Sequence, residues 1–325
     1  EWDEKNSKYI ELDEFETITK ASALWTRPKQ EIKSEEYHDF FKSLGVGNEN
    51  PLAYTHNKVE GRSEYIQLIY IPSKAPFDLY DRQQRHGLKL YVKRVFIMDD
   101  AEQLLPNYLR FIQGVVDSSD LPLNISREIL QESRDIKAIR EGCAKRTLSL
   151  LMELMKNKPD DYKIFWKEFG QCLKEGFGED PSNKDKLAEL MKFKSTFDES
   201  EPNVTLRDYI QRMKVGQENI FVITGDNVQS IKYSPHLEIF KKKNVEVLYL
   251  TDRVDEWMLN FLTDFDGKTI KSVTKGSVDL EKIVIEQTND KKNDQSKSDL
   301  ELKDYETKAK PVIEKAKKVL GEKVK

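Results

Sequence analysis

Hydrophobic residues recur every three or four positions through the centre of the chain, which is the spacing of helices that pack on one face. Residues 128–156 carry such a stripe, and so do the stretches DYKIFWKEFGQCLKEGF and DKLAELMKF that follow. The stretch DYKIFWKEFGQCLKEGF holds four aromatic residues at helical spacing: Tyr162, Phe165, Trp166 and Phe169. We expect these aromatics to lie in a core, and the last two stretches to form a helical connector.

The first hundred residues alternate in a different way. EYIQLIYIP at 64–72 and LKLYVKRVFI at 88–97 alternate apolar and polar positions, which predicts two strands with one covered face each. Residues 32–44 predict a short helix, and residues 101–116 predict a helix that is kinked or begins at Pro106 and ends near Gly114. Strands flanked by helices indicate a layered α-β-α domain of the α/β class.

A second, smaller α-β-α unit follows the connector. Its first segment, TLRDYIQRMKVGQ, predicts a helix, and FVIT at 221–224 and VEVLYL at 245–250 are apolar runs separated by the helical pattern SPHLEIFKKKN. Two such strands joined by one helix form a right-handed, parallel βαβ crossover. The turn TGDNVQS after the first strand has a single glycine, so no dinucleotide site is expected.

These patterns predict four segments: a large α-β-α domain at 1–156, a helical connector at 157–198, a small α-β-α domain at 199–275, and a charged linker with a helical tail at 276–325. The length of 325 residues agrees, because it exceeds what one hydrophobic core usually holds.

Charge and hydropathy restrict the classes of partner that the chain is expected to bind. The chain is 34% charged with a net charge of -4, which describes a solvated surface and not a nucleic-acid binder. It begins EWDEKNSK, without the apolar region of a secretory signal, and no apolar stretch is long enough for a membrane span. A cytoplasmic protein in a reducing compartment is therefore expected.

The spacing of the cysteines and histidines does not indicate a metal site. Cys143 and Cys172 are far apart and belong to no CxxC pair, so both are expected to be small core residues. The four histidines share no metal-ligand spacing: His38, His56, His86 and His236.

The loop DSSDLPLNISREILQ at 117–131 is the clearest candidate site. Asn124 and Ser126 are good N-caps, so Arg127 is expected at a helix start, with Gln131 one turn later on the same face. A guanidinium beside two amide side chains suits recognition of a phosphate. Pairing of Arg127 with a nearby carboxylate remains open as the alternative. Phe96, at the end of the alternating strand, is expected either to support this loop or to lie in the core.

The segment TDRVDEWMLNFLTDFDGK at 251–268 is a second candidate. It predicts a short helix so rich in apolar residues that they cannot all face one core. Trp257 and Met258 are expected either to form an exposed patch that adapts to a partner or to be buried between helix and sheet.

Four stretches together carry a resemblance to a known family: ASALWTR, SEYIQLIYIPSKAPFDLYD, KLYVKRVFIMDDAEQLLPNYLRFIQGVV and DRVDEWMLNFLTDFDGK. With the 117–131 loop, they resemble the middle segment of the 90-kDa heat-shock protein chaperones, closest to the bacterial HtpG type. The resemblance is colinear from about residue 21 to the end of the chain. It implies an ATP-driven molecular chaperone that acts in protein folding and the stress response.

The resemblance also implies roles for particular residues. Arg127 would reach into the ATP site of a separate N-terminal domain and contact the terminal phosphate, with Asn124 and Gln131 as its loop companions. ATP and Mg2+ would be bound by that domain and not by this chain. For the second candidate, the resemblance favours contact with unfolded or partly folded client proteins through Glu256, Trp257 and Asn260, with Met258 in the same patch.

The remaining implied partners are the protein's own N-terminal ATPase domain, its C-terminal dimerisation domain and co-chaperones. Both domains are expected to be missing, so the chain is interpreted as a monomeric segment without a complete active site. The alternative is a non-catalytic protein-interaction scaffold in which Arg127 merely pairs with a carboxylate. An independent enzyme is disfavoured, because no nucleophile, metal or phosphate-loop motif is present.

Overall fold

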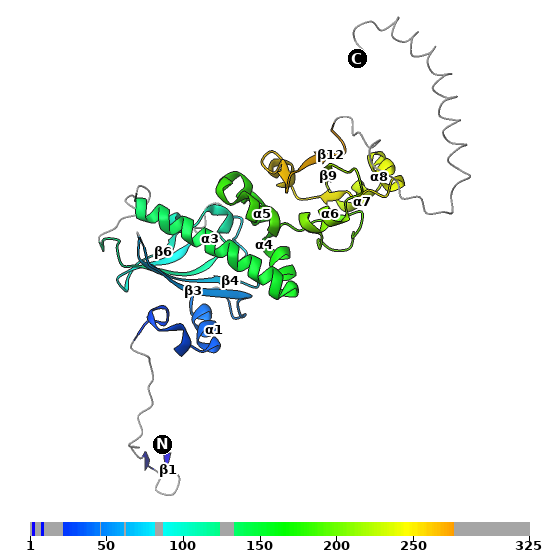
Figure 1. The fold of residues 1–325 in the computed structure, drawn as a ribbon. Coiled ribbons are helices and arrows are strands. Elements are labelled where there is room, and N and C mark those ends of the chain that lie inside the picture. The colour runs from blue at the N-terminus through cyan, green and yellow to red at the C-terminus, as the bar shows by residue number, and fades with distance from the viewer. Residues whose placement is uncertain are drawn as a thin grey trace, which may run out of the picture. The chain divides into compact units, whose positions relative to one another are not determined.

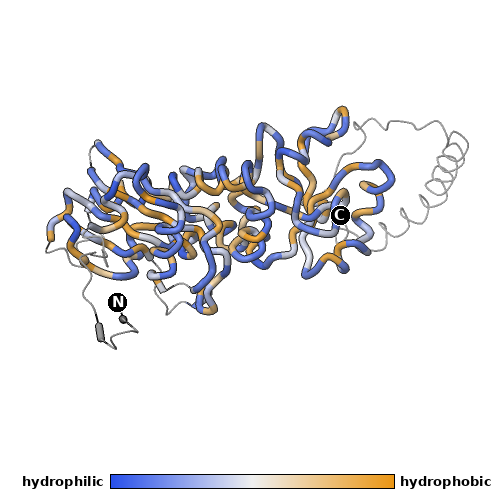
Figure 2. Tube along the Cα trace, turned by 90° about the horizontal axis from the view of Figure 1, so that it is seen from below, coloured by the Kyte–Doolittle hydropathy of each residue, from blue (hydrophilic) through white to orange (hydrophobic). Residues whose placement is uncertain are grey.

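Two five-stranded sheets, each flanked by helices, make up most of the part of the chain that the structure describes (Figure 1). The computed structural model describes residues 22–45, 47–61, 63–81, 87–123 and 133–275, and the backbone of the short strands β1 (Trp2–Asp3) and β2 (Lys8–Tyr9). Apart from residues 214–217, the described residues from 22 to 275 belong to one compact unit. Along the tube in Figure 2, hydrophobic and hydrophilic positions alternate over short distances.

The first sheet has the strand order β3-β4-β7-β5-β6. Its strands are β3 (Ala53–Val59), β4 (Tyr65–Ile71), β5 (Leu88–Val92), β6 (Val95–Ala101) and β7 (Gln113–Ser118). Neighbouring strands are antiparallel except for the parallel pair β5 and β7. Strand β4 confirms the strand predicted at 64–72.

Helices cover both faces of this sheet. Ile69 and Val116 share a core with helix α3 (Arg134–Asn157), whereas Leu68, Tyr70 and Val115 pack with helix α1 (Ser34–Ser43) on the other face. The 3-10 helices η1 (Leu24–Thr26) and η2 (Lys29–Glu31) precede α1. The α-β-α layers confirm the predicted fold class.

The prediction of a helix at 101–116 is wrong. The segment forms two 3-10 turns, η3 (Glu102–Leu104) and η4 (Asn107–Leu109), and then enters β7. Gly114 explains the difference, because its φ is 143° and a Cβ there would lie 2.0 Å from the backbone oxygen of Leu68. Only glycine permits this close approach, so a residue expected to end a helix lets a strand into the centre of the sheet.

The prediction of a single strand at 88–97 is also wrong. The segment forms a hairpin in which Val92 pairs with Val95 across a two-residue turn. Lys93 and Arg94 have φ values of 51° and 68°, the conformation of a type I′ turn, which usually contains asparagine or glycine. Tertiary hydrogen bonds support the unusual residues, since the backbone amide of Lys93 donates to the carbonyl of Ser118 at 2.9 Å.

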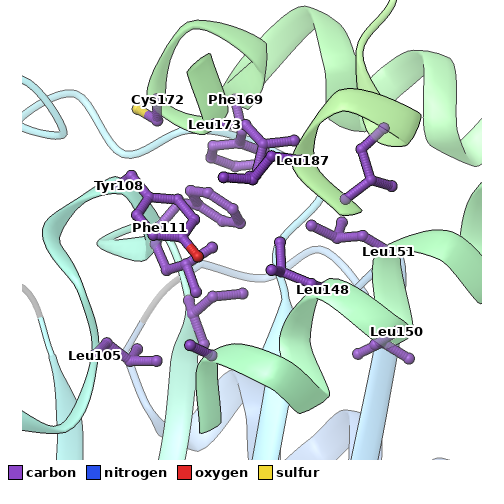
Figure 3. Close-up of a cluster of buried hydrophobic side chains, with 14 of the residues drawn as sticks. Leu105, Tyr108, Phe111, Leu148, Leu150, Leu151, Phe169, Cys172, Leu173 and Leu187 are labelled. Carbon is purple, nitrogen blue, oxygen red and sulfur yellow. The ribbon is translucent and has the colours of Figure 1, made fainter. Parts of the chain in front are cut away.

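The helices predicted after residue 128 are present in the described part of the chain. The stripe at 128–156 forms α3 from Arg134 onward, and the connector stretches form α4 (Pro159–Glu179), the turn η5 (Pro181–Asn183) and α5 (Lys184–Leu190). Side chains from α3, α4, α5 and the η4 segment point toward one another in a single core (Figure 3). Phe111 stacks on Phe169 with ring centroids 4.7 Å apart, so the aromatic positions predicted to be core are buried.

The second sheet has the order β11-β12-β9-β10-β8. Its elements in chain order are β8 (Lys194–Ser195), α6 (Leu206–Arg212), β9 (Asn219–Thr224), α7 (Val228–Lys232), η6 (Pro235–Leu237), α8 (Glu238–Lys242), β10 (Leu248–Leu250), α9 (Asp255–Met258), β11 (Asp264–Phe265) and β12 (Lys268–Ser272). Strands β9 and β10 are parallel, which confirms the predicted βαβ crossover. Strand β8 belongs to this sheet although it precedes residue 199; the segment boundaries stay predictions, and the tail from 276 lies outside the described residues.

Candidate functional site

The loop residues predicted to act on a phosphate, Asn124, Arg127 and Gln131, lie outside the described residues. The structure does describe both flanks of this loop, up to Leu123 and from Ser133 onward. The upstream flank follows strand β7, and the downstream flank is the start of helix α3.

The upstream flank is held by the buried carboxylate of Asp117. Its Oδ2 accepts a hydrogen bond from Trp25 Nε1 at 2.9 Å, and its Oδ1 accepts one from the backbone amide of Arg94 at 3.1 Å. Ser118 Oγ then accepts from the amides of Asp120 and Leu121, both at 3.3 Å. The chain therefore leaves β7 in a hydrogen-bonded turn that is tied to the N-terminal segment and to the β5–β6 hairpin.

Both flanks meet the same short segment between β3 and β4. The amide of Glu64 donates to Asp120 Oδ2 at 2.6 Å, and the carbonyl of Glu64 accepts from the amide of Ser119 at 3.0 Å. On the downstream side, Ser63 Oγ donates to Asp135 Oδ1 at 2.8 Å in the first turn of α3. Two adjacent residues thus connect the strand before the loop with the helix after it, an arrangement that the sequence does not reveal.

Phe96 is not the core residue that one interpretation expected, because it is 49% exposed. It lies on β6 opposite Tyr91, and the two rings form an edge contact with centroids 5.5 Å apart. Tyr91 in turn packs 4.6 Å from Trp25, the residue that holds Asp117. Phe96 is thereby connected through two aromatic rings to the upstream flank; direct support of the loop stays a prediction.

The second candidate site is the segment around α9. Glu256 and Asn260 are exposed and Trp257 is 40% exposed, but Met258 is fully buried, so the expectation that Met258 belongs to an exposed patch is wrong. Met258 directly follows Trp257 in the chain, so the two side chains lie on different faces of the helix, and the face of Met258 is the one that packs into the core. Its place is taken by Phe261, which is 38% exposed and lies 4.8 Å from Trp257 between ring centroids.

The sequence interpretation missed Phe261, although its spacing from Trp257 is a signal. The two residues are four positions apart, the separation that brings side chains together on one helical face. Met258 and Leu262 repeat that spacing and are both buried. The exposed pair Trp257–Phe261 is therefore an aromatic surface backed by a buried pair.

An open groove of about 1130 Å³ lies beside the start of α3. Its charged lining residues are Lys137, Arg140, Glu141, Lys145, Glu179, Asp180 and Lys186. Burial raises the pKa of Asp180, but hydrogen bonds from Ser182, Asn183 and Tyr108 outweigh it and lower the pKa overall. Positive and negative groups are interspersed, so the groove has no single charge sign.

Among the residues that the structure describes, no three histidine, cysteine or acidic side chains are grouped so that they could hold a metal ion. Within the same residues, no helix has the length and apolar character needed to cross a membrane.

Comparison with known proteins gives concordant matches. A family model described as Hsp90 protein matches residues 1–325. The chain is 55% identical over 326 residues to the chaperone protein HtpG of Bordetella avium and 53% identical to that of Bordetella pertussis, covering 100% of this chain and 50% of each relative. The chain thus spans about half the length of these curated relatives. The middle domain of a heat shock protein from Plasmodium falciparum aligns with a TM-score of 0.69 at 31% identity, over 78% of this chain and 99% of that domain.

Proposed function

Because the chain belongs to the Hsp90 protein family, as the sequence resemblance indicated, we propose that it serves as the middle segment of an ATP-driven chaperone. The observation that carries this proposal is the match over the whole chain to proteins named HtpG, together with the match to a middle domain. ATP turnover and assistance to folding are proposed for the whole protein, of which these residues form about half.

In this proposal, Arg127 acts on ATP that an N-terminal domain binds together with Mg2+. Hydrolysis develops negative charge on the oxygens of the terminal phosphate, and a guanidinium supplied by a second domain stabilises that charge. Asn124 and Gln131 would keep the guanidinium oriented. An arginine in such a role has to be held to within about half an ångström. The support for it is the anchoring of both loop flanks on Ser63 and Glu64.

The test is ATP turnover by a polypeptide in which this chain follows the family's N-terminal ATPase domain. We expect Arg127→Ala to lower kcat by about a thousandfold or more, the range known for arginines of this kind. Arg134→Ala, which removes an exposed arginine at the start of α3, serves as the matched control and should leave kcat near the parent value. Equal turnover of the parent and Arg127→Ala would exclude the catalytic role.

We further propose that Glu256, Trp257 and Asn260 contact client proteins. The support is an exposed aromatic pair, Trp257 and Phe261, flanked by polar side chains, since aromatic residues contribute large contact areas at low entropic cost. The measurement is suppression of the aggregation of a chemically unfolded protein. Trp257→Ala should reduce it, whereas Tyr233→Ala, which removes another exposed aromatic, should not.

A non-catalytic scaffold is the alternative, and the same two assays separate it from the chaperone. A scaffold would retain the effect of Trp257→Ala on client binding and show no effect of Arg127→Ala on turnover. A cytoplasmic location, a C-terminal dimerisation domain and co-chaperones as partners are part of the proposal for the whole protein.

A further inference from the structure

One face of helix α4 contacts the α9 segment at three points. Gln171, Lys174 and Gly178 follow one another at intervals of three and four residues, so they lie on the same side of the helix. Gln171 Nε2 donates to Asp252 Oδ1 at 3.2 Å. Lys174 Nζ lies 2.7 Å from Asp252 Oδ2 and 2.6 Å from Asp255 Oδ1.

The ion pair of Lys174 is buried. The side chains of Lys174 and Asp255 are 5% and 1% exposed, and the ammonium also lies over the rings of Trp166 and Phe193. Asp255 Oδ2 accepts from the amide of Asp252 at 2.9 Å, which closes the first turn of α9. A buried pair of this kind specifies one arrangement of two elements, because any other arrangement leaves a charge without its partner.

Gly178 provides the third contact, through the absence of a side chain. A Cβ at this position would lie 2.5 Å from both Cη2 and Cζ2 of Trp257, and 3.2 Å from Cε2 of Phe261. Carbon atoms in ordinary contact are about 3.5–4.0 Å apart, so the indole occupies space that any other residue would fill. The six-membered ring of Trp257 therefore rests against α4 at Gly178, while the residue as a whole remains 40% exposed.

We propose that Lys174 and Gly178 are positioning residues of the aromatic surface formed by Trp257 and Phe261. Lys174 fixes the start of α9, and Gly178 sets how closely the indole approaches α4. The exposed ring is thus presented in one orientation, which lowers the entropic cost of ordering it when a client binds. This inference rests on the proposed contact between Trp257 and client proteins.

Fluorine NMR of the chain labelled with 5-fluorotryptophan reports the position of Trp257 directly. The chain has four tryptophans, and the loss of one resonance in Trp257→Phe identifies that of Trp257. We expect Gly178→Ala to move this resonance and leave that of Trp166 in place. Alanine favours a helix more than glycine does, so α4 itself should persist.

Gly170→Ala is the matched control, because it makes the same change in the same helix next to a different tryptophan. Its Cβ would lie 3.0 Å from Cδ2 and Cε2 of Trp166, so we expect the resonance of Trp166 to move and that of Trp257 to stay. Lys174→Met tests the ion pair of Lys174 and should also move the resonance of Trp257. If Lys174→Met lowers the folded fraction, the result of Gly178→Ala alone decides whether Trp257 is positioned by α4.

The functional measurement is the affinity for fluorescently labelled, reduced and carboxymethylated α-lactalbumin, a permanently unfolded protein. Gly178→Ala should weaken binding by about tenfold, within the range for losing one interface residue that contributes to affinity, and Gly170→Ala should leave the affinity unchanged. An unmoved Trp257 resonance in both Gly178→Ala and Lys174→Met would overturn the inference. So would a moved resonance with unchanged affinity, provided that Trp257→Ala does weaken binding. If Trp257→Ala itself has no effect, the proposed client contact fails, and a moved resonance distinguishes that failure from a failure of positioning.

Discussion

The ion pair between Lys174 and Asp255 allows a quantitative test of how α9 is held. Lys174→Met keeps most of the aliphatic side chain and removes the charge. Asp255 would remain 1% exposed without its nearest cation, and Asp252, at 32% side-chain exposure, would remain in contact with water. Removing one partner of a buried pair costs about 3–5 kcal/mol. We therefore expect the free energy of unfolding to fall by about that amount.

A double-mutant cycle separates the pair from the other contacts of each side chain. Asp255→Asn retains an oxygen that can accept from the amide of Asp252, now 2.9 Å away, but carries no charge. Lys174 keeps Asp252 as a partner in that variant, so the single substitution should cost less than Lys174→Met. The double variant buries no unpaired carboxylate, and its cost should be smaller than the sum of the two by about 2 kcal/mol, within the range for groups in contact.

Urea unfolding at pH 7 and pH 5, followed by circular dichroism and tryptophan fluorescence, provides the assay. Burial raises the pKa of Asp255, and Lys174 opposes that rise. Without Lys174 the pKa rises further above the value of about 3.9 in the unfolded chain. A raised folded pKa favours the folded state at low pH and is unfavourable as pH rises through it. The loss in Lys174→Met should therefore be larger at pH 7 than at pH 5.

Lys167→Met, which changes an exposed lysine of the same helix, controls for the general effect of removing a charge. Two results would refute the interpretation that an unpaired buried carboxylate dominates the loss of stability. One is strictly additive changes in the free energy of unfolding across the cycle. The other is a loss of stability in Lys174→Met that is the same at pH 7 and pH 5.

Three further predictions concern the first sheet. His56 accepts from the hydroxyl of Tyr37 across 2.9 Å, and burial lowers its pKa; stability should therefore fall as pH drops below about 6.5, and His56→Gln should flatten this dependence of Tm on pH. Asp117→Asn leaves either Trp25 Nε1 or a backbone amide of the β5–β6 turn without an acceptor, so urea unfolding should show a loss of about 1–3 kcal/mol, and an unchanged midpoint would contradict the role of Asp117. Gly114→Ala places a Cβ 2.0 Å from a carbonyl oxygen of β4, so the soluble yield of folded chain should collapse, and a Tm near that of the parent would show that the sheet can relax.

Local periodicity was sufficient for much of the fold. The helices α3, α4 and α5 and the parallel pair β9 and β10 followed from apolar spacing, because each segment buries one face or both along its whole length. Strand β7 and the β5–β6 hairpin did not follow, because their cause is not local. Gly114 forms a strand only where β4 lies against it, and the backbone amides of Lys93 and Arg94 in the turn donate hydrogen bonds to acceptors on β7.

For the candidate sites, the residues themselves suggested a phosphate-binding arginine and an aromatic patch, and only the family resemblance assigned their roles. The structure added the anchoring of both loop flanks on Ser63 and Glu64, which are more than fifty positions from the loop flanks in sequence. Contacts of this kind depend on how strands are ordered in a sheet, and the strand order is not encoded in any single segment.

The α9 segment separates the two levels most clearly. Its sequence determines which residues share a face: Trp257 with Phe261, and Met258 with Leu262, because a helix repeats every 3.6 residues. It does not determine which of the two faces is covered. That choice depends on α4, where a glycine admits the indole and a lysine holds the start of α9, and these residues lie about eighty positions earlier in the chain.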